Sequence, residues 1–477
     1  MVRGAWRFAL GSLLLFAGCP KPQAPTPKVR PDEGTTLKLV IVDDPAMAKS
    51  VSQLRSEWKA RSGGELQVIE APLADALTAD AIIYPSSQLG ELVESKRLEP
   101  VPKDVLDSSE LAWPKVFELL TVHDVTWGGE VYALPLGSPV FTLMYRADVL
   151  ERLGKKPPTT WAEYQSLAKA LKSESSPDPA STIEHENPEV ATIEPLAPGW
   201  AGKVLLARAA CYAKHRDNYS ALFRIDTMEP LISGPPFVRA LEELVAASKL
   251  NPETKNRLDP NAARREVLAG RSAMALTWAS AANADNEPSE LPTGARIAFH
   301  ELPGSEQVYN VGNNSWEKRA AGEPHVMPLV SISGRLASVL RTSQYQAGAF
   351  RLIAWLSGPE WSTRVASVSP ATTLYRNSHL KSPKDWVDAN LDASAAVQYG
   401  ETVQEALTRS GCLSVPRIPG HAEYMAALDE AVYAAVEGTS EPKEALAITA
   451  QKWKEITDRL GLEKQRSAYQ RSFGLNL

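Results

Sequence analysis

The chain has 477 residues, a mass of 51.9 kDa and a formal net charge of −6, with a pI near 5.8. This length exceeds what one hydrophobic core organises, so it predicts two or three compact units. The acidic balance argues against a large sequence-independent nucleic-acid surface, which needs clustered basic residues. The seven histidines are never three to five residues apart, so a pattern such as His-Glu-x-x-His is absent. We therefore predict neither a metal nor a cofactor.

Residues 1–18 have the features of a secretory signal peptide. Arg3 and Arg7 precede an apolar stretch of about ten residues, which is too short for a membrane-spanning helix of roughly 20 residues. The stretch ends in Leu-Phe-Ala-Gly-Cys, which resembles a bacterial lipobox, although Phe16 stands where that pattern prefers Leu. Cys19 is then the lipidated new N-terminus. The alternative is a plain signal peptide with a chance cysteine.

Residues 19–36 are rich in proline and almost free of apolar side chains. Such a segment cannot form a core, so we expect a semi-rigid tether between a lipid anchor and a folded body. We expect the protein at the periplasmic face of the cell envelope, anchored to a membrane by lipid. In this oxidising compartment Cys211 and Cys412 are a candidate disulfide. The sequence alone does not show that the two cysteines approach each other.

Residues 37–42 form an apolar run that is typical of a buried parallel strand. A helical stripe follows, and apolar runs at 66–69 and 81–84 predict two more strands. The order strand, helix, strand favours an α/β fold with a parallel sheet and right-handed crossovers. Ligands of such sheets bind beyond the carboxyl ends of the strands. The candidate binding residues at these ends are Asp43, Asp44, Tyr84, Ser86 and Ser87.

The rest of the chain continues the alternation of strands and helices. We expect extended segments or strands at 132–145, 270–278 and 329–340. We expect helices from Trp161 to Leu171 and with apolar stripes over 350–356, 424–435 and 446–460. Thr160 and Glu163 have the spacing of a capping box at the start of the first of these helices. Residues 173–199, rich in Ser, Pro and Glu, predict a surface insertion.

Five segments follow one another in a characteristic order. They are ADAIIYPSSQLGELVESKRLEPV, VYALPLGSPVFTLMYRADVLERLGKKPPTTWAEYQSLAKAL, GRSAMALTWAS, AFRLIAWLSGPEWSTRVASVSPATTLYRNS and RIPGHAEYMAALDEAV. In this order they resemble family 1 extracellular solute-binding proteins of ABC importers, the group that contains maltose-binding protein. The resemblance covers most of residues 37–460 and is weak at 295–325. It implies a bacterial lipoprotein that binds a solute and has no catalytic residues.

The resemblance also implies a two-lobed periplasmic-binding-protein fold of the type II kind, with interleaved lobes joined by crossing hinge strands. By segment match, lobe one comprises 37–140 plus 332–370, and lobe two comprises 141–331 plus 371–477. The implied ligand is a mono- or oligosaccharide held between the lobes. The implied protein partners are the permease subunits of an ABC transporter.

A saccharide presents hydroxyl groups at its edges and C–H groups on its faces, so its site needs polar side chains and aromatic rings. From the matched segments we expect Trp278 to stack on the ligand, with Trp200 and Trp316 as further aromatic candidates. The polar candidates at the crossings and before a late helix are Ser138, Ser331, Ser333 and Arg417, with Tyr424 after them. The alternative for Trp278 is a core position, and the alternative for Asp43 or Asp44 is a helix N-cap.

Two other functions stay open at this point. The same fold with a different solute is one; a polyamine site needs carboxylates and aromatic rings, which Asp43, Asp44 and Trp278 supply. An envelope glycan hydrolase is the other, because its paired carboxylates need not be adjacent in the sequence. The sequence has no Gly-x-Ser-x-Gly motif, so it offers no candidate nucleophile of that kind.

Overall fold

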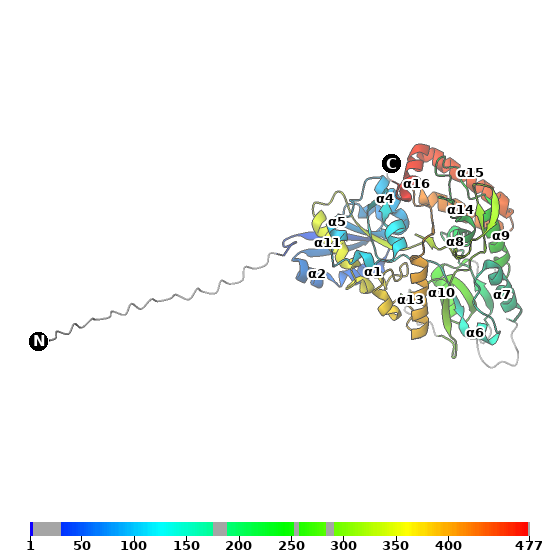
Figure 1. Cartoon of the computed structure of the whole chain (residues 1–477), viewed down its shortest axis with the longest axis horizontal. Helices are drawn as coiled ribbons and strands as arrows, with labels where there is room; N and C mark the ends of the chain where they lie inside the picture. Colours follow the sequence, from blue (N-terminus) through cyan, green and yellow to red (C-terminus); the bar gives the residue numbers. More distant parts are fainter. Residues whose placement is uncertain (3–29, 175–187, 252–256, 283–290, 476–477) are drawn as a thin grey trace.

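The computed structural model describes residues 1–2, 30–174, 188–251, 257–282 and 291–475, and it places two α/β bodies side by side (Figure 1). The first sheet has the strand order β2-β1-β3-β14-β6 and the second has the order β10-β7-β9-β8. The strands of the first sheet are β1 Thr36–Val42, β2 Glu65–Ala71, β3 Ala81–Pro85, β6 Leu134–Pro135 and β14 Arg335–Val339. Those of the second are β7 Thr142–Arg146, β8 Val190–Ile193, β9 Ser272–Thr277 and β10 Ile297–Glu301.

The predicted α/β sheet with parallel strands is confirmed in the first body. Strand β1 pairs in parallel with both β2 and β3, and Leu39 lies opposite Val68 on one side and Ala81 on the other. All β1 side chains from Leu39 to Val42 are buried, because helices cover both faces of the sheet. Strand β14 comes from more than 200 residues further along the chain and joins β3 in antiparallel orientation.

The helices divide between the two bodies, as Figure 1 shows. With the first sheet lie α1 Pro45–Ser52, α2 Arg55–Ser62, α3 Leu73–Ala76, α4 Leu89–Glu94, α5 Lys103–Leu106, α11 Gln346–Ser357 and α12 Ser362–Ala366. With the second lie α6 Ala147–Arg152, α7 Trp161–Glu174, α8 Ala201–Ala213, α9 Pro235–Ser248, α10 Pro260–Leu268, α13 Ala393–Leu407, α14 His421–Val436 and α15 Pro442–Leu460. Helix α16, Leu462–Ser472, contacts α15 and also α4 of the first body.

Each body is built from segments that are not contiguous in the sequence. The chain leaves the first sheet after β6, enters the second at β7, and returns to the first at β14. Short pairs complete the fold: β4 Thr126–Trp127 with β5 Glu130–Val131, β11 Gln307–Asn310 with β12 Ser315–Lys318, and β13 Leu329–Val330 with β15 Leu413–Ser414. The lobe boundaries given above stay a prediction.

The capping box at the start of α7 is confirmed. Thr160 N donates to Glu163 Oε2 and Glu163 N donates to Thr160 Oγ1, each at 3.2 Å. The prediction of a surface insertion at 173–199 is wrong at the C-terminal end of that segment, because β8 is fully buried and pairs in parallel with β9. Its four residues, Val-Ala-Thr-Ile, are too few to show a period, and the neighbouring Glu and Pro residues hide them. Residues 175–187 lie outside the described residues.

The folded body begins before the predicted end of the tether at residue 36. Asp32 is buried, its backbone N–H donates to Ser62 O at 2.9 Å, and its carboxylate pairs with Arg351 on α11. The signal peptide, the lipidation residue Cys19 and residues 20–29 of the tether lie outside the described residues. Among the helices that the structure describes, none combines the length and the apolar character that a bilayer crossing requires.

The candidate disulfide is not formed in this structure. Cys211 and Cys412 are both free, buried thiols. Cys211 lies on α8 and its Sγ donates to Arg208 O at 3.4 Å, whereas Cys412 borders a cavity beside Lys214. The two sulfur atoms therefore lie in different environments and do not bond to each other. Burial raises the pKa of each thiol to about 12, so both are protonated at neutral pH.

Candidate functional site

Three backbone segments meet where the two sheets join, around Gly137, Gly334 and Thr373. Gly137 has φ of 106° and Gly334 has φ of 120°, in the region that favours glycine. A Cβ on Gly334 would lie 2.3 Å from Ser138 Oγ, and one on Gly137 would lie 2.5 Å from Thr373 O. The backbones therefore pass so closely that side chains have no room. We call this junction, residues 136–141, 331–335 and 369–373, the interlobe seam.

Asp44 ties the end of β1 to the seam. Its Oδ1 accepts from Met47 N at 3.1 Å and so caps α1, while its Oδ2 accepts from Arg335 Nε at 2.9 Å and from Ser369 Oγ at 2.5 Å. The N-cap alternative therefore applies to Asp44. Asp43 differs: it is exposed, adopts φ of 49°, and contributes its carbonyl oxygen to Arg335 Nη2 at 3.3 Å. Its carboxylate has no hydrogen-bond partner among the described residues.

A buried carboxyl group lies under the seam at Asp124. Ser331 Oγ donates to its Oδ1 at 2.5 Å, and Ser138 Oγ donates to its Oδ2. Arg417 is almost fully buried and its Nη1 donates to the Asp124 carbonyl oxygen at 2.8 Å. Burial raises the pKa of Asp124, while Arg417 and the two hydroxyls oppose that shift. The structure thus brings the predicted residues Ser138, Ser331 and Arg417 together around one acid.

The remaining hydroxyl candidates of the first body also have partners within the protein. Tyr84 is fully buried and its hydroxyl lies 2.9 Å from Ser338 Oγ. Ser86 Oγ donates to Ser333 O at 2.8 Å, and Ser333 Oγ donates to Ala371 O at 3.2 Å. These bonds hold the end of β3 against the seam. A ligand role for Tyr84, Ser86 or Ser333 stays a prediction.

Three aromatic rings gather on the side of the seam that belongs to the second body. The ring centroids of Trp200 and Trp278 are 5.6 Å apart, and Phe141 lies 5.9 Å from Trp278 and 6.2 Å from Trp200. Trp278 is buried and its Nε1 donates to Pro370 O at 3.1 Å, across the seam. Trp200 is half-buried, so of the two indoles it offers more surface to a ligand. We call Phe141, Trp200 and Trp278 the aromatic cluster.

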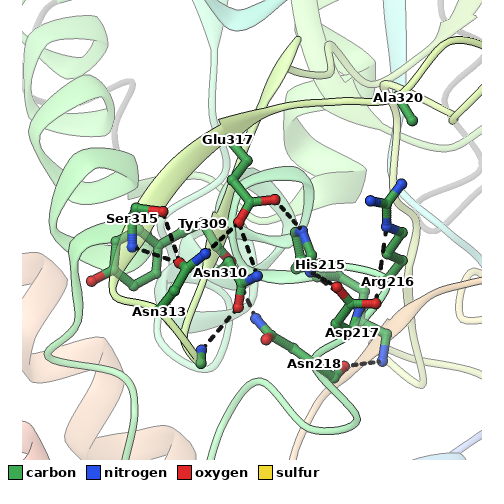
Figure 2. A network of polar contacts seen from close by, with 12 residues as sticks. His215, Arg216, Asp217, Asn218, Tyr309, Asn310, Asn313, Ser315, Glu317 and Ala320 are labelled. Carbon is green, nitrogen blue, oxygen red and sulfur yellow. Dashed lines mark hydrogen bonds and ion pairs between the residues drawn. The ribbon is translucent and has the colours of Figure 1, made fainter.

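Trp316 lies apart from this cluster, on the hairpin β11-β12. Its ring packs against Tyr212 and Tyr309, with centroid distances of 5.9 and 5.4 Å. Figure 2 shows the polar network of the same hairpin, in which Glu317 points toward His215. His215 Nε2 donates to Glu317 Oε2 at 3.1 Å, because Asp217 N occupies Nδ1. This network fastens the hairpin to the loop after α8. Tyr424 also lies outside the seam, with its hydroxyl 2.8 Å from Thr457 Oγ1.

Sequence reasoning missed three polar residues beside the seam. Lys203 Nζ lies 4.2 Å from the Trp200 ring centroid, and burial lowers the pKa of Lys203 to about 8. Asp429 on α14 accepts from Gly202 N at 2.6 Å and so caps α8 from another helix. Gln88 Oε1, after β3, is buried with no hydrogen-bond partner among the described residues. A lysine in the first turn of a helix that is mostly apolar was the one signal in the sequence.

Comparison with known proteins decides the family. The model of the bacterial extracellular solute-binding protein family matches residues 58–363, which is more than half of the chain. The chain belongs to this family. Its members are binding proteins, and this solute-binding protein is accordingly not an enzyme.

Solved structures share the fold of this solute-binding protein at low sequence identity. An ABC transporter solute-binding protein from Agrobacterium radiobacter K84 in complex with ribitol is 19% identical, with a TM-score of 0.62 over 90% of this chain and 100% of that one. The sugar-binding protein MalE from Xanthomonas citri is 20% identical, with a TM-score of 0.63 over 89% and 98% of the two chains. Maltose-bound MalE3 of T. maritima is 19% identical, with a TM-score of 0.62 over 88% and 100%. These likenesses confirm the two-lobed fold.

Proposed function

We propose that this protein captures a carbohydrate or polyol between its lobes and delivers it to the permease subunits of an ABC importer. The observation that carries the proposal is the aromatic cluster at the seam, with the half-buried ring of Trp200 beside Lys203. The structures of similar fold support the ligand class, since their bound molecules are ribitol and maltose. Another such protein, from Agrobacterium vitis S4, holds D-mannitol.

The chemistry of the seam fits a neutral polyhydroxyl ligand. The face of an indole ring packs on the C–H groups of such a ligand. A carboxylate accepts hydrogen bonds from its hydroxyls, and an ammonium group donates hydrogen bonds to them. Trp200 supplies the indole ring, Asp43 the carboxylate and Lys203 the ammonium group. Asp43 lies in a loop of the first body and Trp200 in a loop of the second, both beside the seam. The polyamine alternative loses support, because three hydrogen bonds already occupy the carboxylate of Asp44. It stays an outcome of the test below.

The boundaries of the two lobes are part of the proposal. We take 37–140 plus 332–370 as lobe one and 141–331 plus 371–477 as lobe two, with the seam as the hinge about which they close on the ligand. The C-terminal helix is the exception in this division. Arg471 on α16 pairs with Glu94 on α4, so α16 spans both lobes.

We further propose that the protein is a lipoprotein of the cell envelope, with a signal peptide over residues 1–18, Cys19 as the lipidated residue and a tether from Cys19 that ends before the buried Asp32. The apolar stretch and the Ala-Gly-Cys sequence support this. Expression of the full chain in a bacterial host with a fatty acid that carries an alkyne tag tests it. Label on the wild type and no label on Cys19→Ser are expected. Label on neither chain contradicts the anchor.

Thermal unfolding with a panel of ligands tests the main proposal. A ligand that binds the folded state raises the melting temperature, so ribitol, D-mannitol, maltose or maltotriose should raise it. In calorimetric titration with that ligand, Trp200→Ala should weaken binding about tenfold, as expected for the loss of about 1.4 kcal/mol of ring contact. Trp316→Ala, which removes an indole outside the seam, is the matched control and should bind like the wild type.

Two results would contradict the proposal. One is a melting temperature that no polyol or saccharide raises while spermidine does, which favours the polyamine alternative. The other is a Trp200→Ala protein that binds the sugar as tightly as the wild type. Incubation of the protein with the ligand should leave the ligand uncleaved.

A further inference from the structure

A cavity of about 140 Å³ lies on the structure away from the aromatic cluster. Its walls come from four separate parts of the chain. The first is the helical turn η3 (Leu120–Asp124), and the second is the loop that follows α8. The third is the segment 410–417 around β15, and the fourth is the end of α16. Residues from both bodies therefore enclose it. We call it the basic cavity, after the three side chains described next.

Three basic side chains line the basic cavity: His123, Lys214 and Arg417. Lys214 Nζ donates to the carbonyl oxygens of Asn218 and Tyr219, both at 3.1 Å, which orders the ammonium group at the wall. Arg417 is almost fully buried and its guanidinium makes its shorter bond to the Asp124 carbonyl oxygen. The acceptors in these contacts are neutral carbonyl oxygens. They hold the two cations in place but do not neutralise their positive charge.

The lining of the basic cavity contains no aspartate or glutamate. Neither Lys214 nor Arg417 has an ion pair with a carboxylate in the described part of the chain. The acid that acts most strongly on Arg417 is Asp124, whose carboxyl group accepts hydrogen bonds from Ser138 and Ser331 of the seam. The thiol of Cys412, also in the wall, is protonated, since burial raises its pKa to about 12. The cationic side chains of Lys214 and Arg417 thus share a partly enclosed space, and the carboxyl group of Asp124 lies behind its wall.

The electrostatics of the neighbouring groups agree with an excess of positive charge. Burial first, and then the charges of Arg417 and Lys214, lower the pKa of His123 to about 4. Burial lowers the pKa of Lys214 too. A buried cation without a counter-ion is costly, and proteins normally give it a partner. In the basic cavity no carboxylate lines the wall beside Lys214 and Arg417, and the cavity has room for an anion in its place.

We propose that the basic cavity is a binding site for a small oxyanion, in contact with Lys214 and Arg417. The walls also carry Ser414 and Ser472, whose hydroxyls donate to the carbonyl oxygens of Val415 and Tyr469, so the two cations are the groups that attract an anion. The volume is well above the roughly 10–15 Å³ that a cavity needs, by the same measure, to hold one water molecule. It is smaller than the roughly 300–1,000 Å³ of pockets for drug-sized ligands. The occupant is therefore of the size of phosphate, sulfate or a short carboxylate, and it is separate from the sugar.

Thermal unfolding of the folded chain with inorganic phosphate, sulfate and acetate tests this site. Ionic strength is held constant with sodium chloride, because surface charges respond to any salt. The melting temperature should rise with phosphate or sulfate and saturate, as a single site requires. A rise with acetate alone would assign the site to carboxylates. Lys214→Met, which keeps the apolar stem, should weaken anion binding at least tenfold, and Lys214→Arg should retain it.

Lys169→Met is the matched control, since Lys169 is an exposed lysine on α7. This variant should respond to the anions like the wild type. A crystal soaked in tungstate locates the site, with the expected anomalous signal between Lys214 and Arg417. The proposal is overturned if none of the three anions gives a saturable rise in the wild type. It is also overturned if Lys214→Met, shown to be folded by circular dichroism, responds like the wild type or if tungstate binds elsewhere only.

Discussion

Asp44 should be among the most costly residues to replace at the seam. Its carboxylate caps α1 and also pairs with Arg335, whose side chain is 10% exposed while that of Asp44 is 3% exposed. Loss of an N-cap costs about 1 kcal/mol. Removal of one partner of a buried ion pair costs about 3–5 kcal/mol, because the other charge stays buried without compensation. Arg335 keeps two carbonyl contacts, at 3.2 and 3.3 Å, so we expect the lower end of that range.

We therefore expect Asp44→Ala to lower the free energy of unfolding by about 3–4 kcal/mol. Asp392→Ala is the matched control, since Asp392 caps α13 through Ala395 N at 2.7 Å and has no ion pair within the described chain. It should lose only about 1 kcal/mol. Urea unfolding followed by circular dichroism gives both values from the shift of the midpoint at unchanged slope.

A double variant separates the cap from the charge. In Asp44→Ala the cost comes mainly from unpaired Arg335, so Arg335→Met in the same chain should recover part of it. Asp44→Asn should lie between the wild type and Asp44→Ala, because the amide oxygen still accepts from Met47 N. If Asp44→Ala costs no more than Asp392→Ala, or if Arg335→Met adds a further loss, the ion pair does not have the stabilising role given to it here.

The close backbone approach at Gly334 and the half-buried His421 give two further predictions. Gly334→Ala places a Cβ 2.3 Å from Ser138 Oγ at φ of 120°, whereas Gly322→Ala at φ of 82° meets nothing within 4 Å. Melting temperatures should therefore fall clearly further for Gly334→Ala than for Gly322→Ala, and equal losses would contradict the packing of the seam. Burial lowers the pKa of His421 to about 4 from the usual 6.5, so the unfolded chain binds a proton that the folded chain refuses. This group should therefore lower the free energy of unfolding by up to about 3 kcal/mol as the pH falls from 6.5 to 4. In urea unfolding at a series of pH values, His421→Gln should make the free energy of unfolding depend less on pH. A pH dependence equal to that of the wild type would refute the role given to His421.

Local patterns in the sequence predicted the local structure well. The apolar run at 37–42 became β1, Thr160 and Glu163 formed their capping box, and Asp44 took the N-cap position that its place before Pro45 allows. Each of these depends on residues a few positions apart. Strand β8 was not predicted, because four residues are too few to show a periodic pattern. Helix α16 was not predicted, because most of its residues are polar.

The partners of the candidate site residues could not be predicted in the same way. Ser86 Oγ binds a carbonyl oxygen 247 positions away, and Arg335 Nε binds a carboxylate 291 positions away. No periodicity or cap links such residues, since only the interleaving of the two sheets brings them together. Cys211 and Cys412 illustrate the reverse case: the predicted oxidising compartment would allow a disulfide, but both cysteines are free, buried thiols in the structure.

The internal bonds of the seam indicate where ligand specificity resides. Asp44, Ser86, Ser138 and Ser331 are buried and already have protein partners, so a ligand could bind them only by breaking those bonds. Groups that remain available belong instead to the loops on either side: Asp43 and Gln88 after strands of the first sheet, and Trp200 and Lys203 at the start of α8. The choice between one polyol and another should therefore change with substitutions in these loops. Substitutions of the buried serines should instead change the stability of the junction and leave the preference among ligands as it is.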